Sequence, residues 1–308
     1  MDVPLPDAVN TRPVLRAENI QKSFGEFAAV RGISFDVAPG ECVGLLGPNG
    51  AGKTTTMRMI MGLSTLSAGE LSVFGTPVAQ IGREQIKRIG LVPQEDNLDP
   101  DLTVRENLEV YAHYFGLAVQ DIVSRVPELL DFMQLSDRSD ARVMQLSGGM
   151  KRRLVIARAL VASPDLVILD EPTTGLDPQA RVLIWKQLLD LKRQRKTLLL
   201  TTHYMDEAQR LCDRIIIVDE GMILAEGAPA DLINTHVLGH VFEVSKPLPQ
   251  AWDTERWESE DIGDAVLFYV SDPQEFALSV AVGTHYLHRQ ANLEDVFLRL
   301  TGRALREP

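Results

Sequence analysis

Five short apolar runs recur along the chain, and each is nearly uninterrupted rather than alternating with polar residues. Such runs are typical of strands that are buried on both faces of a parallel sheet. Segments with helical character lie between them, so the pattern predicts an α/β fold with a mostly parallel sheet. The predicted strands cover residues 42–46, 89–92, 166–169, 197–201 and 215–218.

The region from about residue 96 to 163 has a different pattern, with helical periodicity and no convincing strand. Thr103 followed by Glu106 fits a capping box at the start of a helix. Apolar residues then repeat at i, i+4, i+7 and i+11, which places them on one helix face: Val104, Leu108, Tyr111 and Phe115. A second apolar stripe lies within residues 154–161. We therefore expect a helical insertion in the α/β domain.

The two ends of the chain differ from its centre. Residues 1–13 contain three prolines and no periodicity, which predicts a flexible tail. Residues 14–230 hold the α/β pattern. Residues 231–308 are expected to form a small α+β accessory domain, with a strand over 266–270 and a capped terminal helix over 292–300.

Composition and charge exclude several classes of protein. The chain has 308 residues, 45% of them hydrophobic, and a net charge of −12, which argues against nucleic acid as a partner and against direct adhesion to anionic lipid. The longest stretch without Asp, Glu, Lys or Arg, residues 276–288, is too short to span a bilayer. The N-terminus lacks the features of a secretion signal, so we expect an intracellular protein. Cys42 and Cys212 are expected to be buried free thiols.

A glycine-rich segment between the first predicted strand and a helical segment fits the pattern GxxxxGK[ST] of a phosphate-binding loop. Its backbone N–H groups can bind phosphates, Lys53 can reach the β and γ phosphates of a nucleotide, and the Thr54 hydroxyl can bind Mg²⁺. By itself this loop is compatible with kinases, GTPases, helicases and transport ATPases. The candidate ATP-binding residues here are Gly47, Pro48, Asn49, Gly50, Ala51, Gly52, Lys53, Thr54 and Thr55.

Two further segments carry candidate chemistry. The strand over 166–169 ends in Asp170, placed to bind Mg²⁺, and Glu171, placed to polarise water, although many strands end in solvated carboxylates. Ser147, Gly148 and Gly149 stand at the start of a helical segment and predict a second anion-binding loop. The basic residues that follow are interpreted as a solvated helix face rather than a nucleic-acid surface: Lys151, Arg152, Arg153 and Arg158.

Together these segments resemble the ATP-binding-cassette (ABC) ATPases, which are P-loop NTPases, over about residues 14–230. The resemblance also rests on Gln94 after a strand, on Gly175-Leu-Asp177 and on His203. It implies a dimer in which each ATP lies between the Lys53 loop of one copy and the Ser147–Gly149 loop of the other. It further implies that Phe24 stacks on adenine and that Asp177 lies in a loop at the dimer seam.

The resemblance also assigns roles at the reaction centre. Glu171 would be the general base and His203 would contact the γ phosphate, while Gln94 would complete the shell of Mg²⁺ and water. Mg²⁺ would be bound by Thr54, Gln94 and Asp170, with ATP as the substrate.

Within this family, the motifs are similar to the exporter ATPases that pair with ABC-2-type permeases, and most similar to the nodulation-factor (lipo-oligosaccharide) export group, followed by the daunorubicin-resistance group. This similarity implies a homodimer on the cytoplasmic face of the inner membrane, bound to a separate permease. One departure is Met150, where many members have Gln. The alternative is a soluble ABC ATPase without a transport role, although such proteins usually carry two cassettes or a coiled-coil insertion.

Overall fold

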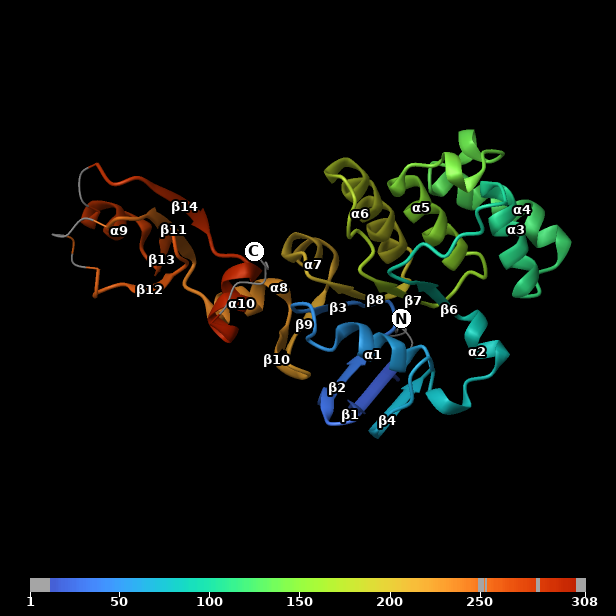
Figure 1. Ribbon diagram of the computed structural model, residues 1–308, viewed down its shortest axis with the longest axis horizontal. Coiled ribbons are helices and arrows are strands. Elements are labelled where there is room, and N and C mark those ends of the chain that lie inside the picture. The colour runs from blue at the N-terminus through green and yellow to red at the C-terminus, as the bar shows by residue number, and fades with distance from the viewer. Residues whose placement is uncertain (1–11, 249–251, 253, 281–282, 303–308) are drawn as a thin grey trace, which may run out of the picture. The chain divides into compact units, whose positions relative to one another are not determined.

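The computed structural model describes residues 12–248, 252, 254–280 and 283–302 (Figure 1). The chain divides into two compact units between Leu224 and Ala225, whereas the sequence-based boundary was placed between residues 230 and 231. Most of the tail predicted over residues 1–13 lies outside the described residues, and the first strand begins at Leu15.

A six-stranded sheet in the order β10-β9-β3-β8-β7-β6 forms the centre of the first unit, and the boundary between the units falls within its edge strand β10. The five predicted strands are confirmed within it, and β3 pairs in parallel with β8 and β9, as β7 does with β6 and β8. Because these strands run in the same direction, the loops after their carboxyl ends gather at one edge. The strands are β3 (Cys42–Leu46), β6 (Ile89–Val92), β7 (Leu166–Asp170), β8 (Thr197–Thr202), β9 (Arg214–Asp219) and β10 (Met222–Gly227).

A second, antiparallel sheet in the order β2-β1-β4-β5 was not predicted from the sequence. Its strands alternate buried and exposed residues only in part, because the pairing of β1 with β2 is interrupted by register shifts. Residues of both sheets and of helix α1 share one apolar core. The elements are β1 (Leu15–Phe24), β2 (Phe27–Val37), β4 (Ala68–Val73), β5 (Thr76–Pro77) and α1 (Lys53–Ile60).

The segment predicted as a helical insertion contains three helices that lie together in Figure 1: α3 (Val104–Tyr114), α4 (Val119–Phe132) and α5 (Gly148–Ala159). The capping box of α3 is confirmed, since the Thr103 hydroxyl accepts from the Glu106 N–H and the Glu106 carboxylate accepts from the Thr103 N–H. The remaining helices of this unit are η1 (Val78–Gln80), α2 (Arg83–Lys87), η2 (Ser136–Arg138), η3 (Val143–Gln145), α6 (Pro178–Arg193) and α7 (Met205–Leu211).

The second unit contains an antiparallel sheet in the order β12-β13-β11-β14. Phe242, Phe268 and Phe276 form its core on one face. The predicted strand and terminal helix are both present, and Asn292 caps that helix. The elements are α8 (Pro229–His236), β11 (His240–Ser245), β12 (Glu258–Asp261), β13 (Ala265–Val270), α9 (Pro273–Ser279), β14 (Tyr286–Gln290) and α10 (Leu293–Thr301).

Within the part of the chain that the structure describes, every helix is too short or too polar to cross a membrane. Cys42 and Cys212 are buried free thiols, as the sequence predicted.

Candidate nucleotide site

The phosphate-binding loop connects β3 to α1, and its last glycine has a conformation that other residues rarely adopt. Gly52 has φ = 99°, and a Cβ atom there would lie 2.6 Å from the carbonyl oxygen of Ala29. Gly52 therefore lets the chain turn sharply from the loop into the helix, which begins at Lys53. The rest of the motif comprises exposed Asn49 and Gly50, buried Gly47 and Ala51, and half-buried Pro48, Thr54 and Thr55.

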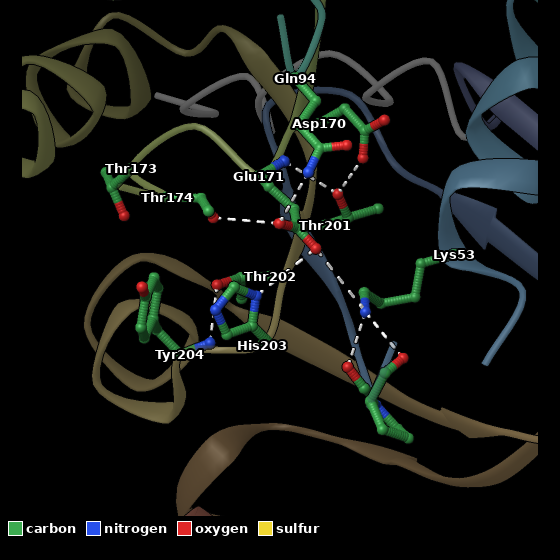
Figure 2. Close-up of polar contacts among 12 residues, drawn as sticks. Lys53, Gln94, Asp170, Glu171, Thr173, Thr174, Thr201, Thr202, His203 and Tyr204 are labelled. Carbon is green, nitrogen blue, oxygen red and sulfur yellow. Dashed lines mark hydrogen bonds and ion pairs between the residues drawn. The ribbon is translucent and has the colours of Figure 1, made fainter. Parts of the chain in front are cut away.

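The Lys53 side chain is buried and folds back over the loop that precedes it (Figure 2). Its Nζ donates to the carbonyl oxygens of Gly47 at 2.7 Å and Pro48 at 3.0 Å, and lies 3.9 Å from Oε1 of Glu171. Burial lowers the pKa of Lys53, and the charges of Glu171 and Asp170 oppose that effect. The ammonium group thus stands between the loop and the carboxylates.

The two acidic residues at the end of β7 are both bound by a threonine of the neighbouring strand β8. The Thr201 hydroxyl accepts from the backbone N–H of Glu171 at 3.0 Å and donates to Oδ1 of Asp170 at 2.5 Å. Burial raises the pKa of Asp170, and this hydrogen bond opposes the rise. Glu171 has φ = 45°, a conformation that costs energy for a residue with a side chain and is often found at functional sites.

Side chains from three loops surround the Glu171 carboxylate (Figure 2). Thr174 Oγ1 donates to Oε2 at 3.0 Å, Gln94 Nε2 donates to the same oxygen at 3.4 Å, and His203 Nδ1 lies 3.4 Å from Oε1. The contact with His203 is the largest cause that lowers the pKa of Glu171, and Thr174 and Lys53 add to it while burial opposes it. The carboxylate is therefore ionised at neutral pH.

The order of the parallel strands explains this convergence. β3, β8, β7 and β6 are neighbours in that order, and the loops after them carry Lys53, His203, Glu171 and Gln94 respectively. The sheet thus brings together the predicted phosphate, water-polarising and metal-binding residues.

Other predicted site residues lie at separate places. Phe24, at the end of β1, is 55% exposed and its ring is contacted by Lys22. Ser147 caps α5 by accepting from the Met150 N–H at 3.3 Å, and Asp177 caps α6 by accepting from the Ala180 N–H at 2.9 Å.

Gly148 is exposed next to Ser147, and Gly149 is buried against the first turn of α6. A Cβ atom on Gly149 would lie 2.7 Å from that of Ala180, so a glycine is required for this close approach. The Ser147–Gly149 loop and the Asp177 loop therefore lie side by side.

Three contact residues of the cluster were not predicted from the sequence. Thr201 ends a predicted strand next to Thr202 and His203, and a hydroxyl at a strand end was the available signal. Thr174 lies three residues after Glu171. Arg152 donates to the backbone carbonyl oxygens of Asp170 and Glu171, and nothing in the sequence around it indicated these contacts.

The interpretation of the basic residues on α5 as a solvated face was wrong for two of the four. Arg152 is 4% exposed and Arg158 is 5% exposed. Arg158 donates to the carbonyl oxygen of Asn97 at 2.6 Å and its guanidinium lies over the ring of Tyr111. A run of basic residues in an acidic chain predicts a solvated helix face, whereas backbone carbonyls and an aromatic ring inside the domain accept the buried guanidinium groups.

A third buried carboxyl group lies on α7 just after His203. Oε1 of Glu207 accepts from Thr173 Oγ1 at 2.7 Å and from Trp185 Nε1 at 3.0 Å. Burial raises the pKa of Glu207, and the hydrogen bonds from Thr202, Thr173 and Trp185 oppose the rise. This group joins the His203 loop to the segment that follows Glu171.

We expect Glu207→Gln to stabilise the protein at pH 8 relative to the parent and to lose that advantage as the pH falls through the pKa of Glu207. A carboxyl with a raised folded-state pKa loses stability as the pH rises above its unfolded-state value, and glutamine keeps an oxygen acceptor without ionising. Glu207→Leu should be less stable at both pH values, by about 1–3 kcal/mol, because both donors lose their acceptor. Thermal unfolding at pH 5 and pH 8 measures the stability of each variant relative to the parent. If the stability of the parent and that of Glu207→Gln change equally with pH, ionisation of Glu207 does not affect stability and the prediction is contradicted.

The fold has counterparts among solved structures. A dimeric post-hydrolysis structure of the ATP-binding cassette MJ0796, bound to ADP and Pi, superposes with a TM-score of 0.63 at 29% identity and covers 70% of this chain and 98% of its own. CbiO1 from Clostridium perfringens, part of an ABC transporter complex, gives a TM-score of 0.67 at 28% identity over 72% of this chain and 91% of its own. The fold and the site thus define an ATP-binding-cassette ATPase.

Sequence comparisons narrow this class. The ABC transporter family matches residues 30–174, and the family described as "Nodulation factor export protein NodI, C-terminal domain" matches residues 249–302. "Nod factor export ATP-binding protein I" of Burkholderia lata is 52% identical over 94% of this chain and 97% of its own length. The protein of the same name from Cupriavidus metallidurans is 49% identical over 96% of this chain and 99% of its own length. The chain belongs to this family of ABC transporter ATP-binding proteins.

It is therefore the ATPase subunit of an exporter complex. Subunits of this class dimerise, work with a membrane permease, and use ATP with magnesium.

Proposed function

We propose that two copies of this chain form a head-to-tail homodimer that hydrolyses two ATP molecules and drives export through a separate ABC-2-type permease. The observation that carries the proposal is the convergence of Lys53, Gln94, Glu171 and His203 at one edge of the parallel sheet. The Ser147–Gly149 loop has no described hydrogen bond to this cluster, which is consistent with a role toward the ATP of the second copy.

The residues suit hydrolysis by an activated water. The N–H groups of the phosphate-binding loop and the Lys53 ammonium bind the β and γ phosphates. Glu171 is ionised and accepts a proton from the attacking water, and Gln94 and Thr174 hold its carboxylate in place. His203 lies 3.4 Å from the same carboxylate and is the residue that we assign to contact with the γ phosphate.

The donor set fits magnesium. Thr54, Gln94 and Asp170 offer hydroxyl, amide and carboxylate oxygens, the hard ligands that Mg²⁺ prefers, and Asp170 is buried with one oxygen bonded to Thr201. Magnesium bound with ATP supplies positive charge that stabilises charge developing on the phosphates.

Beside the Gln94 segment lies an apolar groove of about 570 Å³, which suits the docking of a permease. Pro93 and Asn97 line it on either side of Gln94, so an occupant would contact the segment that reaches Glu171. Tyr114 on α3 also lines it and is 76% exposed. Docking here would place the chain on the cytoplasmic face of the inner membrane through protein contacts, despite its acidic charge.

The substrate class follows from the relatives. These relatives are named as Nod factor export proteins, and their similarity to this chain includes the C-terminal unit. We propose a lipo-oligosaccharide, or an amphipathic molecule of related chemistry, as the exported substrate. Stimulation of ATP hydrolysis by such a molecule, in the complex of this chain with its permease in lipid nanodiscs, tests this proposal, and no stimulation would contradict it.

We expect Tyr114→Glu to weaken binding of the permease by roughly tenfold or more and to leave basal ATP hydrolysis unchanged, because a charge in an apolar contact loses the energy of an aromatic anchor. Co-purification with the permease and its stimulation of ATP hydrolysis measure the effect. Val123→Glu is the control, because Val123 on α4 is 71% exposed and does not line the groove. If both variants lose permease binding equally, or if neither loses it, docking at this groove is contradicted.

A further inference from the structure

Arg152 makes an unusual set of contacts for an arginine. It lies on α5, in the same helix whose first turn is capped by Ser147, and its guanidinium group is almost completely buried. It donates hydrogen bonds to five backbone carbonyl oxygens: Pro93 at 2.5 Å, Pro172 at 2.7 Å, Asp170 at 3.0 Å, Glu171 at 3.2 Å and Gln94 at 3.3 Å.

These carbonyls belong to the two segments that carry the residues around the reaction centre. One segment contains Gln94 and the other contains Asp170 and Glu171. The buried charge is also stabilised by carboxylates: Asp96 lies 3.9 Å away, and the charges of Asp170, Glu171 and Glu207 oppose the effect of burial, which lowers the pKa of Arg152. A planar guanidinium with several fixed donors can hold two segments together in this way.

The contact has a direct bearing on Glu171. The backbone of Glu171 has a φ of 45°, which costs energy, and hydrogen bonds hold the peptide groups on both sides of this residue. Thr201 binds its N–H and Arg152 binds its carbonyl oxygen. Strained conformations of this kind persist only where the surroundings hold them.

We propose that Arg152 is a positioning residue for ATP hydrolysis, which fixes the backbone of Glu171 and Gln94 relative to α5. The side chains of Gln94 and Glu171 contact each other, so the distance between their segments decides where the carboxylate points. Arg152 sets that distance from the backbone side.

A second consequence rests on the proposed head-to-tail dimer. The first turn of α5 would bind the ATP held by the other copy, while Arg152 on the same helix holds the Glu171 segment that serves this copy's own ATP. Binding of ATP at one site is thereby linked through α5 to the geometry of the other.

The first test uses Arg152→Lys, which keeps the charge but replaces the planar fork with an ammonium that has only three donors. We expect kcat for ATP to fall by roughly 10- to 100-fold, since small misplacements of reacting groups cost about that much. The affinity of the single chain for a fluorescent ATP analogue should stay within about threefold of the parent, because the phosphate-binding loop is not altered.

Arg153→Lys is the matched control, because Arg153 is the next residue on α5 and also donates to backbone carbonyls. Its partners, Met133 and Gln134, follow α4 and lie outside the cluster. We expect Arg153→Lys to have a kcat within about twofold of that of the parent. The inference is overturned if the two variants lose kcat equally, if Arg152→Lys retains full kcat, or if its kcat and ATP affinity fall together with its melting temperature.

The second test adds Arg152→Lys to Glu171→Gln and measures ATP-induced dimers by size-exclusion chromatography. We expect the ATP concentration for half-maximal dimer formation to rise by roughly tenfold, and Arg153→Lys to leave it unchanged. An unchanged value in the Arg152 variant overturns the linkage between sites. If Glu171→Gln itself forms no dimer with ATP, the proposed function fails instead, and the effect on kcat still decides whether Arg152 positions Glu171.

Discussion

Replacing Glu171 with glutamine is expected to abolish ATP turnover while ATP still binds and holds two copies together. Glutamine has nearly the same shape and keeps an oxygen that can accept from Thr174, but it cannot take a proton from water at neutral pH. General-base catalysis contributes about 10²- to 10⁴-fold to the rate, so kcat should fall by at least about 100-fold. The phosphate contacts of Lys53 and the loop are not altered.

Two measurements check this expectation. Steady-state ATP hydrolysis gives the loss of kcat, and size-exclusion chromatography with ATP and Mg²⁺ gives the fraction of dimer, which should rise above that of the parent. Glu207→Gln is the matched control, because it makes the same change at a buried carboxyl that accepts its hydrogen bonds from Thr173 and Trp185. Normal hydrolysis by Glu171→Gln would show that another group is the base.

The second large effect is expected from Lys53→Ala, which should weaken the binding of ATP itself. Hydrogen bonds to charged groups contribute about 1.5–3 kcal/mol, so the loss of the ammonium should raise the Kd for ATP by roughly 10- to 100-fold. The same change removes the cation 3.9 Å from Glu171 and leaves the carbonyl oxygens of Gly47 and Pro48 without this donor. Hydrolysis should therefore fall as well.

Titration with a fluorescent ATP analogue measures the change in Kd. Arg58→Ala is the control, because Arg58 lies on the same helix with its side chain exposed to solvent. Thermal unfolding of both variants shows whether α1 remains folded. An unchanged Kd in Lys53→Ala would contradict the role of the phosphate-binding loop.

Much of the local structure could be predicted from the sequence. The five strands of the parallel sheet, the capping box at Thr103 and the terminal helix begun by Asn292 were all predicted close to their observed bounds. These features depend on neighbours along the chain, because a buried parallel strand needs a continuous apolar run and a helix cap needs an acceptor near free N–H groups.

The antiparallel sheet of β1, β2 and β4 was not predicted, because its strands lack a regular local pattern. Register shifts break the alternation of β1, so its period is irregular over most of its length. β1 pairs with β2, which follows it directly, and with β4, which lies some way further along the chain, and these pairings make it a sheet.

For the site, the sequence by itself determined the phosphate-binding loop and the acidic pair at the end of β7. The assignment of His203 and Gln94 came from resemblance to a family, since a single histidine or glutamine after a strand has no specific pattern. The structure places both against Glu171 because their strands are neighbours in the sheet.

Arg152 marks the limit of what a sequence can decide. Four basic residues on a helix predict a solvated face, because isolated charges are costly to bury. Only the tertiary structure supplies the five carbonyl oxygens that make burial of this one favourable. The sequence by itself predicted the phosphate-binding loop and determined the strands of the parallel sheet, since those properties are local. The tertiary structure decided which side chains surround Glu171 and what holds its backbone, because those contacts join segments distant along the chain.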